Sequence, residues 1–221
     1  MKALAVLLAG SALAVAANAT VISGGTFNNA LSTTEIHQTG SLNKFNSNLG
    51  KLTGIELRLT GQAVTAFSLQ NTSAQTQTAR ADAFVELSYG SSAAALNAAL
   101  AVENPFIVIN ASVPNSSYLA GEIKNFAGFS NDAIDKSFFS TDASVLNELQ
   151  SAILGSKFTV SCDSESGITI RGGGGNMKAT QNTQGRCAGE ILYTYDVPEP
   201  DALALVGLAL AGIALVRRRK A

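Results

Sequence analysis

Few side chains in this chain of 221 residues could perform acid–base or nucleophilic chemistry. His37 is the single histidine and lies between Ile36 and Gln38 in a segment of alternating polarity. A catalytic histidine needs a nucleophile or a metal ion within reach, yet the sequence contains no Gly-x-Ser-x-Gly and no His-Glu-x-x-His motif. We therefore interpret His37 as an exposed strand histidine and expect that the protein is not an enzyme.

Two further patterns could bind ligands. Asp132 and Asp135 could supply oxygen ligands to Ca²⁺, but their spacing is not that of an EF-hand, so we interpret the segment as a solvated loop and leave calcium open. The glycines 172–175 lack the Gly-Lys-Ser/Thr continuation of a phosphate-binding loop and are typical of a hairpin tip. No pair among the acidic residues stands out as a glycosidase pair. We expect no cofactor and no metal.

The N-terminus has the composition of a signal peptide, and such a segment directs the export of the domain that follows it. Lys2 precedes an apolar run, and Ala17 and Ala19 supply the small residues of a cleavage site. We expect residues 1–19 to be removed by cleavage after Ala19, so that the mature chain begins at Thr20. The alternative is that this segment stays attached as a permanent anchor.

The C-terminal segment 197–221 has three parts: the residues Val197-Pro198-Glu199-Pro200, an apolar run over 202–216, and the basic group Arg217, Arg218, Arg219 and Lys220. As a helix the run would be about 24 Å long, against a hydrocarbon core of about 30 Å. Snorkelling basic side chains can make up part of the difference. The positive-inside rule places the basic end in the cytoplasm, which leaves the Pro-Glu-Pro motif on the periplasmic side.

This tail resembles the PEP-CTERM signal of Gram-negative envelope proteins. The resemblance implies a transient partner, an exosortase of the inner membrane that processes the tail. It also implies a transient transmembrane helix over 202–216, followed by delivery to the cell surface or the extracellular matrix. The alternative is an ordinary tail anchor that is never cut.

The segment between the two ends, residues 20–196, is long enough for one domain with a sizeable core. It carries ten Lys and Arg residues and fourteen Asp and Glu residues. Because no basic stripe is present, nucleic acid is not an expected partner. Cys162 and Cys187 are the two cysteines, and in an oxidising compartment they predict a disulfide.

Hydrophobic alternation predicts a mainly β fold. Ile55, Leu57 and Leu59 alternate with Glu56 and Arg58, which is typical of a strand with one solvated face. We expect an antiparallel β-sandwich with strands over 20–28, 31–38, 55–60, 63–70, 79–87, 106–110, 121–126, 137–140, 158–162, 168–171 and 187–195. In this prediction 20–28 and 31–38 form a hairpin, Gly61 ends one strand and 71–77 is a polar turn. Helices are expected over 92–102 and 142–154, the second capped by Thr141 or Asp142 and ended by Gly155.

Two segments extend the family resemblance into the domain. Residues 45–61 combine a leading Phe45, a Leu-Gly-x-Leu pattern and an alternating strand that ends in Thr-Gly, and the strand 190–195 runs directly into the tail. Both resemble the choice-of-anchor E domains, which implies an exported β-sandwich of a family named for its anchors. We expect a structural or interaction role linked to exopolysaccharide or biofilm. The alternatives are a carbohydrate-binding module, with Tyr89, Tyr118, Tyr193 and Tyr195 as stacking residues, and a secreted hydrolase.

Overall fold

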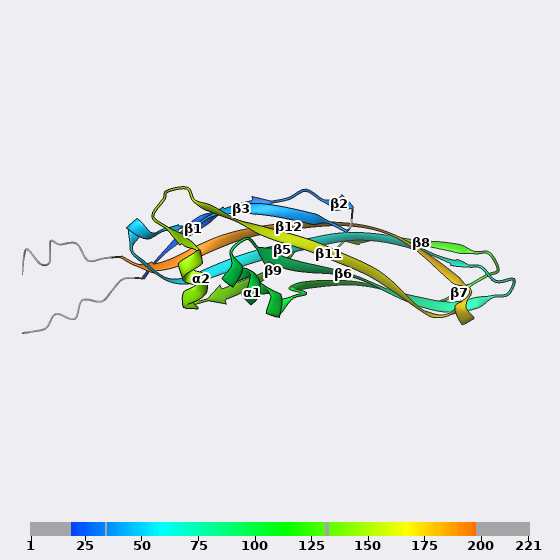
Figure 1. Cartoon of the computed structure of the whole chain (residues 1–221). Coiled ribbons are helices and arrows are strands. Elements are labelled where there is room, and N and C mark those ends of the chain that lie inside the picture. Colours follow the sequence, from blue (N-terminus) through cyan, green and yellow to red (C-terminus); the bar gives the residue numbers. More distant parts are fainter. Residues whose placement is uncertain (1–18, 34, 131–132, 198–221) are drawn as a thin grey trace, which may run out of the picture.

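The computed structural model describes residues 19–33, 35–130 and 133–197. Two antiparallel sheets pack face to face into an elongated sandwich (Figure 1). Sheet A contains, side by side, β1 (Ala19–Asn28), β12 (Met177–Asp196), β5 (Lys51–Asn71) and β8 (Ile123–Ser130), with β2 (Ser32–Thr33) beside β12 and β9 (Ile134–Ser140) beside β5. Sheet B has the order β3 (His37–Asn43), β11 (Lys157–Gly172), β6 (Gln77–Ser91) and β7 (Ile107–Tyr118). The mainly β, sandwich-like character predicted from the sequence is therefore confirmed.

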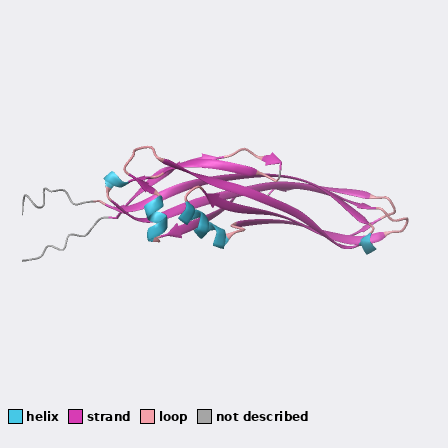
Figure 2. Cartoon of the chain, viewed as in Figure 1, coloured by secondary structure: helices cyan, strands magenta, loops and turns pink. Residues whose placement is uncertain are grey.

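Short elements complete the described fold, and Figure 2 shows that its helices gather along one part of the sandwich, apart from a single turn at the far end. They are β4 (Phe45–Asn46), β10 (Gln150–Ser151), α1 (Ala94–Glu103), α2 (Ala143–Glu148) and the 3₁₀ turns η1 (Ser47–Leu49) and η2 (Gly173–Gly175). The predicted helix 92–102 is thus found as α1. The predicted strands 121–126 and 137–140 are found as β8 and β9.

The two ends of the sandwich differ. Ala19 pairs with Asp196, so both described chain ends leave the same end of the molecule, which we call the tail end. The opposite end, which we call the tip, carries the turns that join β5 to β6, β7 to β8 and β11 to β12 (Figure 1). β5 has 21 residues and β12 has 20, and at about 3.3 Å per residue such strands are about 65 Å long.

The prediction that Gly61 ends a strand is wrong. β5 is continuous from Lys51 to Asn71, and its burial alternates without a break through Gly61. A Cβ on Gly61 would overlap Leu87 and lie 3.0 Å from Cδ1 of Ile107, both on the other sheet. Gly61 therefore marks a close approach between the two sheets and not a turn. The segments 158–162 and 168–171 are likewise parts of one strand, β11.

The predicted hairpin of 20–28 and 31–38 is also wrong. β1 pairs with β12 in sheet A, whereas β3 pairs with β11 in sheet B. Phe27 of β1 shows the physical reason, because its ring fills the space where Gly40 of β3 and Gly189 of β12 have no Cβ. The N-terminal strands thus close one edge of the sandwich by packing across it.

The second helix is shorter than predicted. Asp142 caps α2, since its Oδ1 accepts a hydrogen bond of 2.8 Å from the Ser144 N–H. The helix ends at Glu148 and not before Gly155, because the Phe45 N–H donates to the Leu149 carbonyl at 2.8 Å. The following residues, Gln150 and Ser151, then pair in parallel with β4.

The predicted strand 106–110 is the beginning of a longer one. β7 runs from Ile107 to Tyr118 and pairs only with β6 among the described strands. Pro114 is tolerated within it because an edge strand needs no donor on its free side and because the pairing register shifts there.

The core has two parts. The larger cluster lies toward the tail end and contains Leu57, Leu59 and Leu87 together with residues of α1 and α2. The smaller cluster lies toward the tip and combines Phe67, Leu69 and Tyr118 with small side chains such as Ala79 and Ala81. The tip half of the sandwich is therefore held together by fewer large apolar side chains than the tail half.

Candidate functional site

The last strand before the sorting segment is fixed by aromatic packing. Phe45 packs against Tyr193 and Tyr195, with ring centroids 5.7 and 5.1 Å apart. The Tyr193 hydroxyl donates a hydrogen bond of 2.7 Å to the carbonyl of Asn43. β12 is thus anchored to both sheets up to Asp196, and the sorting segment starts from a rigid base.

Part of the predicted sorting apparatus lies outside the described residues. Val197 is described and is 43% exposed, and Ala19 and Thr20 lie in β1. Outside the described residues lie Ala17, Pro198, Glu199, Pro200, Arg217, Arg218, Arg219, Lys220 and the predicted helix 202–216. In the described ranges, no helix has the length and apolar character needed to cross a membrane.

The predicted disulfide is confirmed. Cys162 and Cys187 are bonded, with their Cα atoms 6.4 Å apart, and both side chains are buried. Cys162 belongs to β11 and Cys187 to β12. The bond therefore joins the two sheets through the larger core.

His37 forms a surface pair with one acid. Its Nδ1 lies 2.5 Å from Oδ1 of Asp163, and the side chains are 69% and 56% exposed. Ser88 is the residue opposite Asp163 on the other side of β11, so a whole strand separates it from His37. Two strand spacings amount to about 10 Å, which is too far for the histidine to take a proton from the Ser88 hydroxyl.

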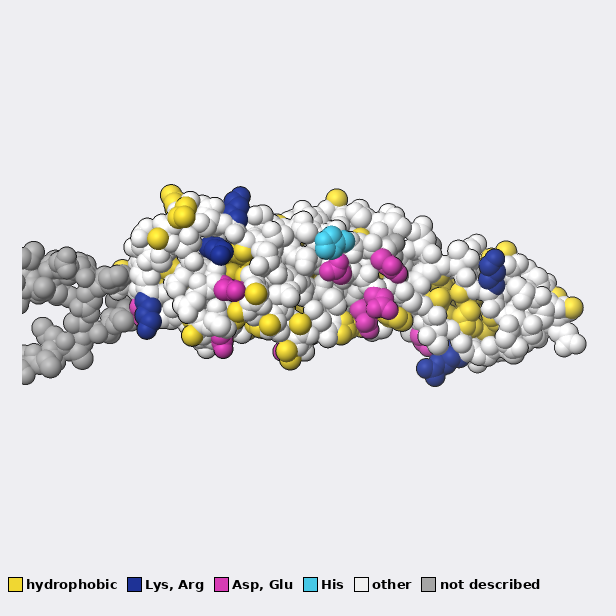
Figure 3. Space-filling view, in the orientation of Figure 1, with side chains coloured by type: hydrophobic (Ala, Val, Ile, Leu, Met, Phe, Trp, Pro, Cys, Tyr) yellow, Lys and Arg dark blue, Asp and Glu magenta, His cyan; other side chains and the backbone are white. Residues whose placement is uncertain are grey.

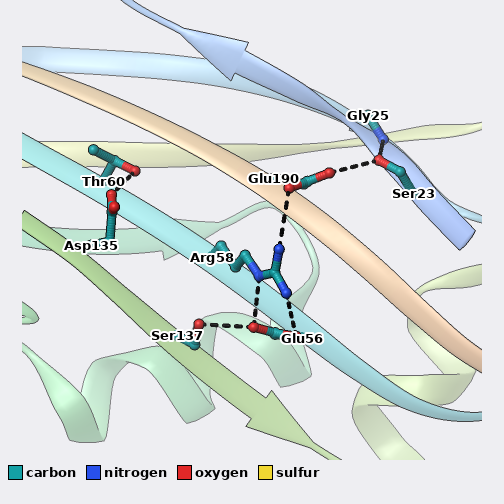
Figure 4. A network of polar contacts seen from close by, with 8 residues as sticks. All are labelled: Ser23, Gly25, Glu56, Arg58, Thr60, Asp135, Ser137 and Glu190. Carbon is teal, nitrogen blue, oxygen red and sulfur yellow. Dashed lines mark hydrogen bonds and ion pairs between the residues drawn. The ribbon is translucent and has the colours of Figure 1, made fainter. Parts of the chain in front are cut away.

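A larger polar network covers the outer face of sheet A (Figure 4). Arg58 of β5 donates to Glu56 through two hydrogen bonds of 2.7 and 3.2 Å, and its guanidinium lies 3.8 Å from Glu190 of β12. Ser137 of β9 donates to Glu56 at 3.0 Å, and Ser23 of β1 donates to Glu190 at 3.2 Å. The network therefore links four neighbouring strands.

The electrostatics of this network favour the ionised form of Glu56. The hydrogen bonds from Arg58 lower the pKa of Glu56 below its usual value, and its partial burial only partly offsets this effect. A general acid of a glycosidase needs a raised pKa. Glu56 and Glu190 flank the same guanidinium, so the arrangement links β5 to β12, and the lowered pKa of Glu56 does not suit that residue to proton donation.

The network borders a groove of about 610 Å³ that also contains Arg186 and Asp135. Arg186 is held by Gln62, which accepts from its Nε at 2.6 Å, and Asp135 accepts a hydrogen bond of 2.5 Å from Thr60. Asp132, the other residue considered for calcium, lies outside the described residues. Within the described ranges, no group of three or more His, Cys, Asp and Glu residues is arranged to hold a metal ion.

The tyrosines considered as stacking residues of a carbohydrate-binding module are not available for that role. All four are buried, with exposed fractions of 7% or less: Tyr89, Tyr118, Tyr193 and Tyr195. The Tyr89 hydroxyl donates to the Thr60 carbonyl at 3.0 Å. Their alternation with polar residues could have indicated this, because Tyr193 and Tyr195 share the inward face of their strand with Ile191.

Sequence reasoning also missed the network around Arg58. The signal available was the presence of opposite charges at outward positions of two strands, Arg58 and Glu190. Only the pairing register, in which Glu190 lies opposite Arg58, brings them together.

Comparison with known proteins finds one family match. Residues 196–220 match the PEP-CTERM protein-sorting motif, which begins at the last residue of β12 and includes both the Pro-Glu-Pro triplet and the basic group. A search of curated proteins finds no match.

Likeness to solved structures is weak. A chain of "Structure of infectious bursal disease virus Gx strain" is 11% identical with a TM-score of 0.19, and 88% of this chain and 47% of that chain are covered. For "The 2.6A structure of Infectious Bursal Virus Derived T=1 Particles" the identity is 11%, the TM-score 0.16 and the coverage 88% and 46%. The present chain spans less than half the length of these viral chains, and TM-scores this low support no argument. The PEP-CTERM match, in contrast, supports an exported protein that an exosortase processes, with transient membrane anchoring on its way to the cell surface.

Proposed function

We propose that this protein is a non-enzymatic component of the cell envelope or extracellular matrix, with a structural or interaction role linked to exopolysaccharide or biofilm. The observation that carries the proposal is the position of the sorting motif, which follows β12 directly. Because Thr20, the expected first residue of the mature chain, is paired with Tyr195, both ends of the domain lie at the tail end. A processing enzyme in the membrane can then reach the motif without unfolding the sandwich.

The shape of the domain supports the same role. The long strands place the tip about 65 Å from the tail end, so a chain held by its tail would project its tip away from the membrane. We propose that the domain is a member of the choice-of-anchor E type, on the strength of the segments 45–61 and 190–195. Residues 1–19 act as the signal peptide, and 202–216 forms the transient membrane helix.

The alternatives receive less support. The four tyrosines considered for a carbohydrate-binding module are buried, and Phe139 is an exposed aromatic side chain. A hydrolase would need an acid with a raised pKa, whereas Arg58 lowers the pKa of Glu56. Neither a cofactor nor nucleic acid is part of the proposal.

The test is the intact mass of the full-length chain's surface form in a Gram-negative strain with a working exosortase. We expect the surface protein to lack residues 217–221. In the double variant Pro198→Ala/Pro200→Ala, uncut precursor should accumulate in the inner membrane, as it should for the unchanged protein in a matched strain without the exosortase. Surface protein that retains 217–221, with unchanged delivery of the double variant, would instead establish an uncut anchor.

A further inference from the structure

The turn between β10 and β11 carries two aliphatic side chains that project into solvent. Ile153 and Leu154 are 74% and 83% exposed. Leu49, the last residue of η1, is exposed as well. Scattered apolar residues are normal on a protein surface, whereas large apolar side chains that gather at one place need an explanation. We call Leu49, Ile153 and Leu154 the apolar rim.

Polar groups of the turn itself hold these side chains outward. The Ser156 N–H donates to the Ile153 carbonyl at 3.3 Å, and the Ile153 N–H donates to Oγ of Ser151 at 3.1 Å. Gly155 adopts a φ of +79°, a left-handed conformation that glycine favours. The backbone of the turn is therefore satisfied without the two aliphatic side chains, which remain exposed at its apex.

The apolar rim lies at the tail end of the sandwich. The side-chain amide of Asn48 donates to the Ala152 carbonyl at 3.2 Å, which joins the two turns. Leu49 comes two residues before Lys51, and Lys51 pairs with Asp196. Figure 1 shows the turn between β10 and β11 at the same end as both described chain ends, to one side of them. The apolar rim is therefore close to the place where the sorting segment begins.

The apolar rim is connected to the base of the sorting segment through packed residues. β10 pairs with β4, and Phe45 of β4 packs against Tyr195 of β12 with ring centroids 5.1 Å apart. The Lys44 N–H donates to the Ser156 carbonyl at 2.7 Å. These contacts fix the direction of the rim relative to the point where the chain continues into the sorting segment.

Three lysines flank the apolar rim: Lys44, Lys51 and Lys157. Lys157 begins β11 and lies opposite Asn43, and Lys51 begins β5 and lies opposite Asp196. Within the described ranges none of the three forms an ion pair. On the face shown in Figure 3, hydrophobic side chains protrude at the tail end and basic side chains lie beside them. Apolar side chains flanked by basic ones are typical of a surface that binds anionic lipid.

The sorting segment would bring this surface to the membrane. Four residues, 198–201, separate Val197 from the predicted membrane helix 202–216, and four extended residues span at most about 14 Å. The headgroup layer on each side of a bilayer is itself about 5–8 Å thick. In a precursor held by its tail, the tail end is therefore in or against the headgroups.

We propose that the apolar rim is a membrane-docking surface of the uncut precursor. Ile153 and Leu154 enter the interface between headgroups and acyl chains, while Lys44, Lys51 and Lys157 contact lipid phosphates. The proposal rests on the membrane helix of the proposed function, because two aliphatic side chains alone hold a protein to a bilayer only weakly. Because the rim lies to one side of the chain ends, docking tilts the sandwich toward that side and fixes the direction from which an enzyme can approach the Pro-Glu-Pro motif.

The absence of tryptophan from the chain makes a specific test possible. The uncut precursor with Leu154→Trp is reconstituted through its tail into nanodiscs of equal parts phosphatidylcholine and phosphatidylglycerol. We expect the tryptophan emission to shift to shorter wavelength and to be quenched by lipids with brominated acyl chains. The matched control is Leu119→Trp, which replaces an exposed leucine at the tip and should keep the emission of a solvated indole.

The outcomes separate this proposal from the proposed function. A precursor that does not stay in the nanodisc would overturn the membrane helix and the docking surface together. A precursor that stays, with the same emission and quenching for Leu154→Trp as for Leu119→Trp, would overturn the docking surface alone. A shift that appears only after an exosortase is added to the nanodisc would make the enzyme the occupant of the rim and would also overturn the proposal.

Charge reversal tests the lysines separately. In the Leu154→Trp precursor, Lys157→Glu should lower the ratio of inserted to free rim at least about fivefold, since one basic side chain near an anionic surface contributes about 1 kcal/mol. Lys178→Glu, at the tip end of β12, is the control and should leave the ratio unchanged. In nanodiscs of phosphatidylcholine alone the two variants should behave alike. Equal quenching of the two variants in the anionic nanodiscs would overturn the proposed contact with lipid phosphates.

Discussion

At the scale of single residues, Tyr193 connects the stability of the fold to pH. Its hydroxyl donates to the Asn43 carbonyl at 2.7 Å, and burial raises its pKa well above the ordinary value. Because the folded state favours the neutral phenol, this contribution to stability is fully present below the unfolded pKa of about 10. It is lost as the pH rises from there toward the folded pKa.

Tyr193→Phe should therefore lower the free energy of unfolding more at neutral pH than at alkaline pH. Near pH 7 the variant leaves the Asn43 carbonyl without its donor, which should lower the free energy of unfolding by about 1–2 kcal/mol. Above a pH of about 10 the unchanged protein should lose stability faster than the variant. The free energies of unfolding of the two proteins should therefore become more similar as the pH rises. Urea unfolding at several pH values measures this, and a difference that stays constant across the range would contradict it.

The disulfide makes the second residue-scale prediction. Cys162 and Cys187 join the two sheets, and closing a loop of this size restricts the unfolded chain. Cys162→Ala/Cys187→Ala should lower the free energy of unfolding by about 3 kcal/mol. Thermal or urea unfolding measures the change. The reduced native protein should match the double variant, and a reducing agent should leave the double variant itself unaffected. Equal free energies of unfolding for the oxidised and the reduced protein would contradict this prediction.

At the scale of elements, two glycines of β5 differ in what surrounds them. A Cβ on Gly61 would overlap Leu87, whereas a Cβ on Gly54 would find its nearest neighbour at 3.8 Å. Gly61→Ala should therefore force the sheets apart and lower the free energy of unfolding by about 1–3 kcal/mol. Gly54→Ala should be neutral or stabilising by up to about 1 kcal/mol, because it restricts the unfolded chain. Chemical denaturation of both variants tests this pair, and equal effects would refute the close-approach explanation of Gly61.

The strands that could be predicted from the sequence were those with strict alternation, such as the segment 79–87, because alternation reports which side chains face inward. It does not report the partner strand. The hairpin expected for 20–28 and 31–38 failed because Phe27 packs across the edge of the sandwich, a contact between residues distant in sequence. The helix expected over 142–154 is present only as far as Glu148, because the Phe45 N–H donates to the Leu149 carbonyl and the chain then pairs with β4.

Some of the candidate sites could be predicted from the sequence, and others could not. The tail could be predicted because a linear motif carries its signal in the order of residues alone, as the match over 196–220 shows. The disulfide could be predicted because the chain has two cysteines. The contact of Arg58 with Glu190, and the like-charged pairs between β11 and β6, could not be predicted because they depend on strand register.

At the scale of the whole molecule, the strand lengths predict an elongated particle. A compact domain of the size of the described chain would have a radius of gyration of about 16 Å. Strands of about 65 Å instead predict a value above about 20 Å and a correspondingly large maximum dimension. Small-angle X-ray scattering of the processed protein at low concentration measures both quantities.

This measurement also decides whether the tip can act at a distance from the tail end. Both chain ends lie at the tail end, and the three hairpin turns of the tip lie at the other. If the particle is rod-like in solution, a chain held by its tail presents the tip well beyond the membrane surface. A radius of gyration near 16 Å would mean that the two core clusters do not hold the sandwich straight, and the tip could not then project from the membrane as proposed.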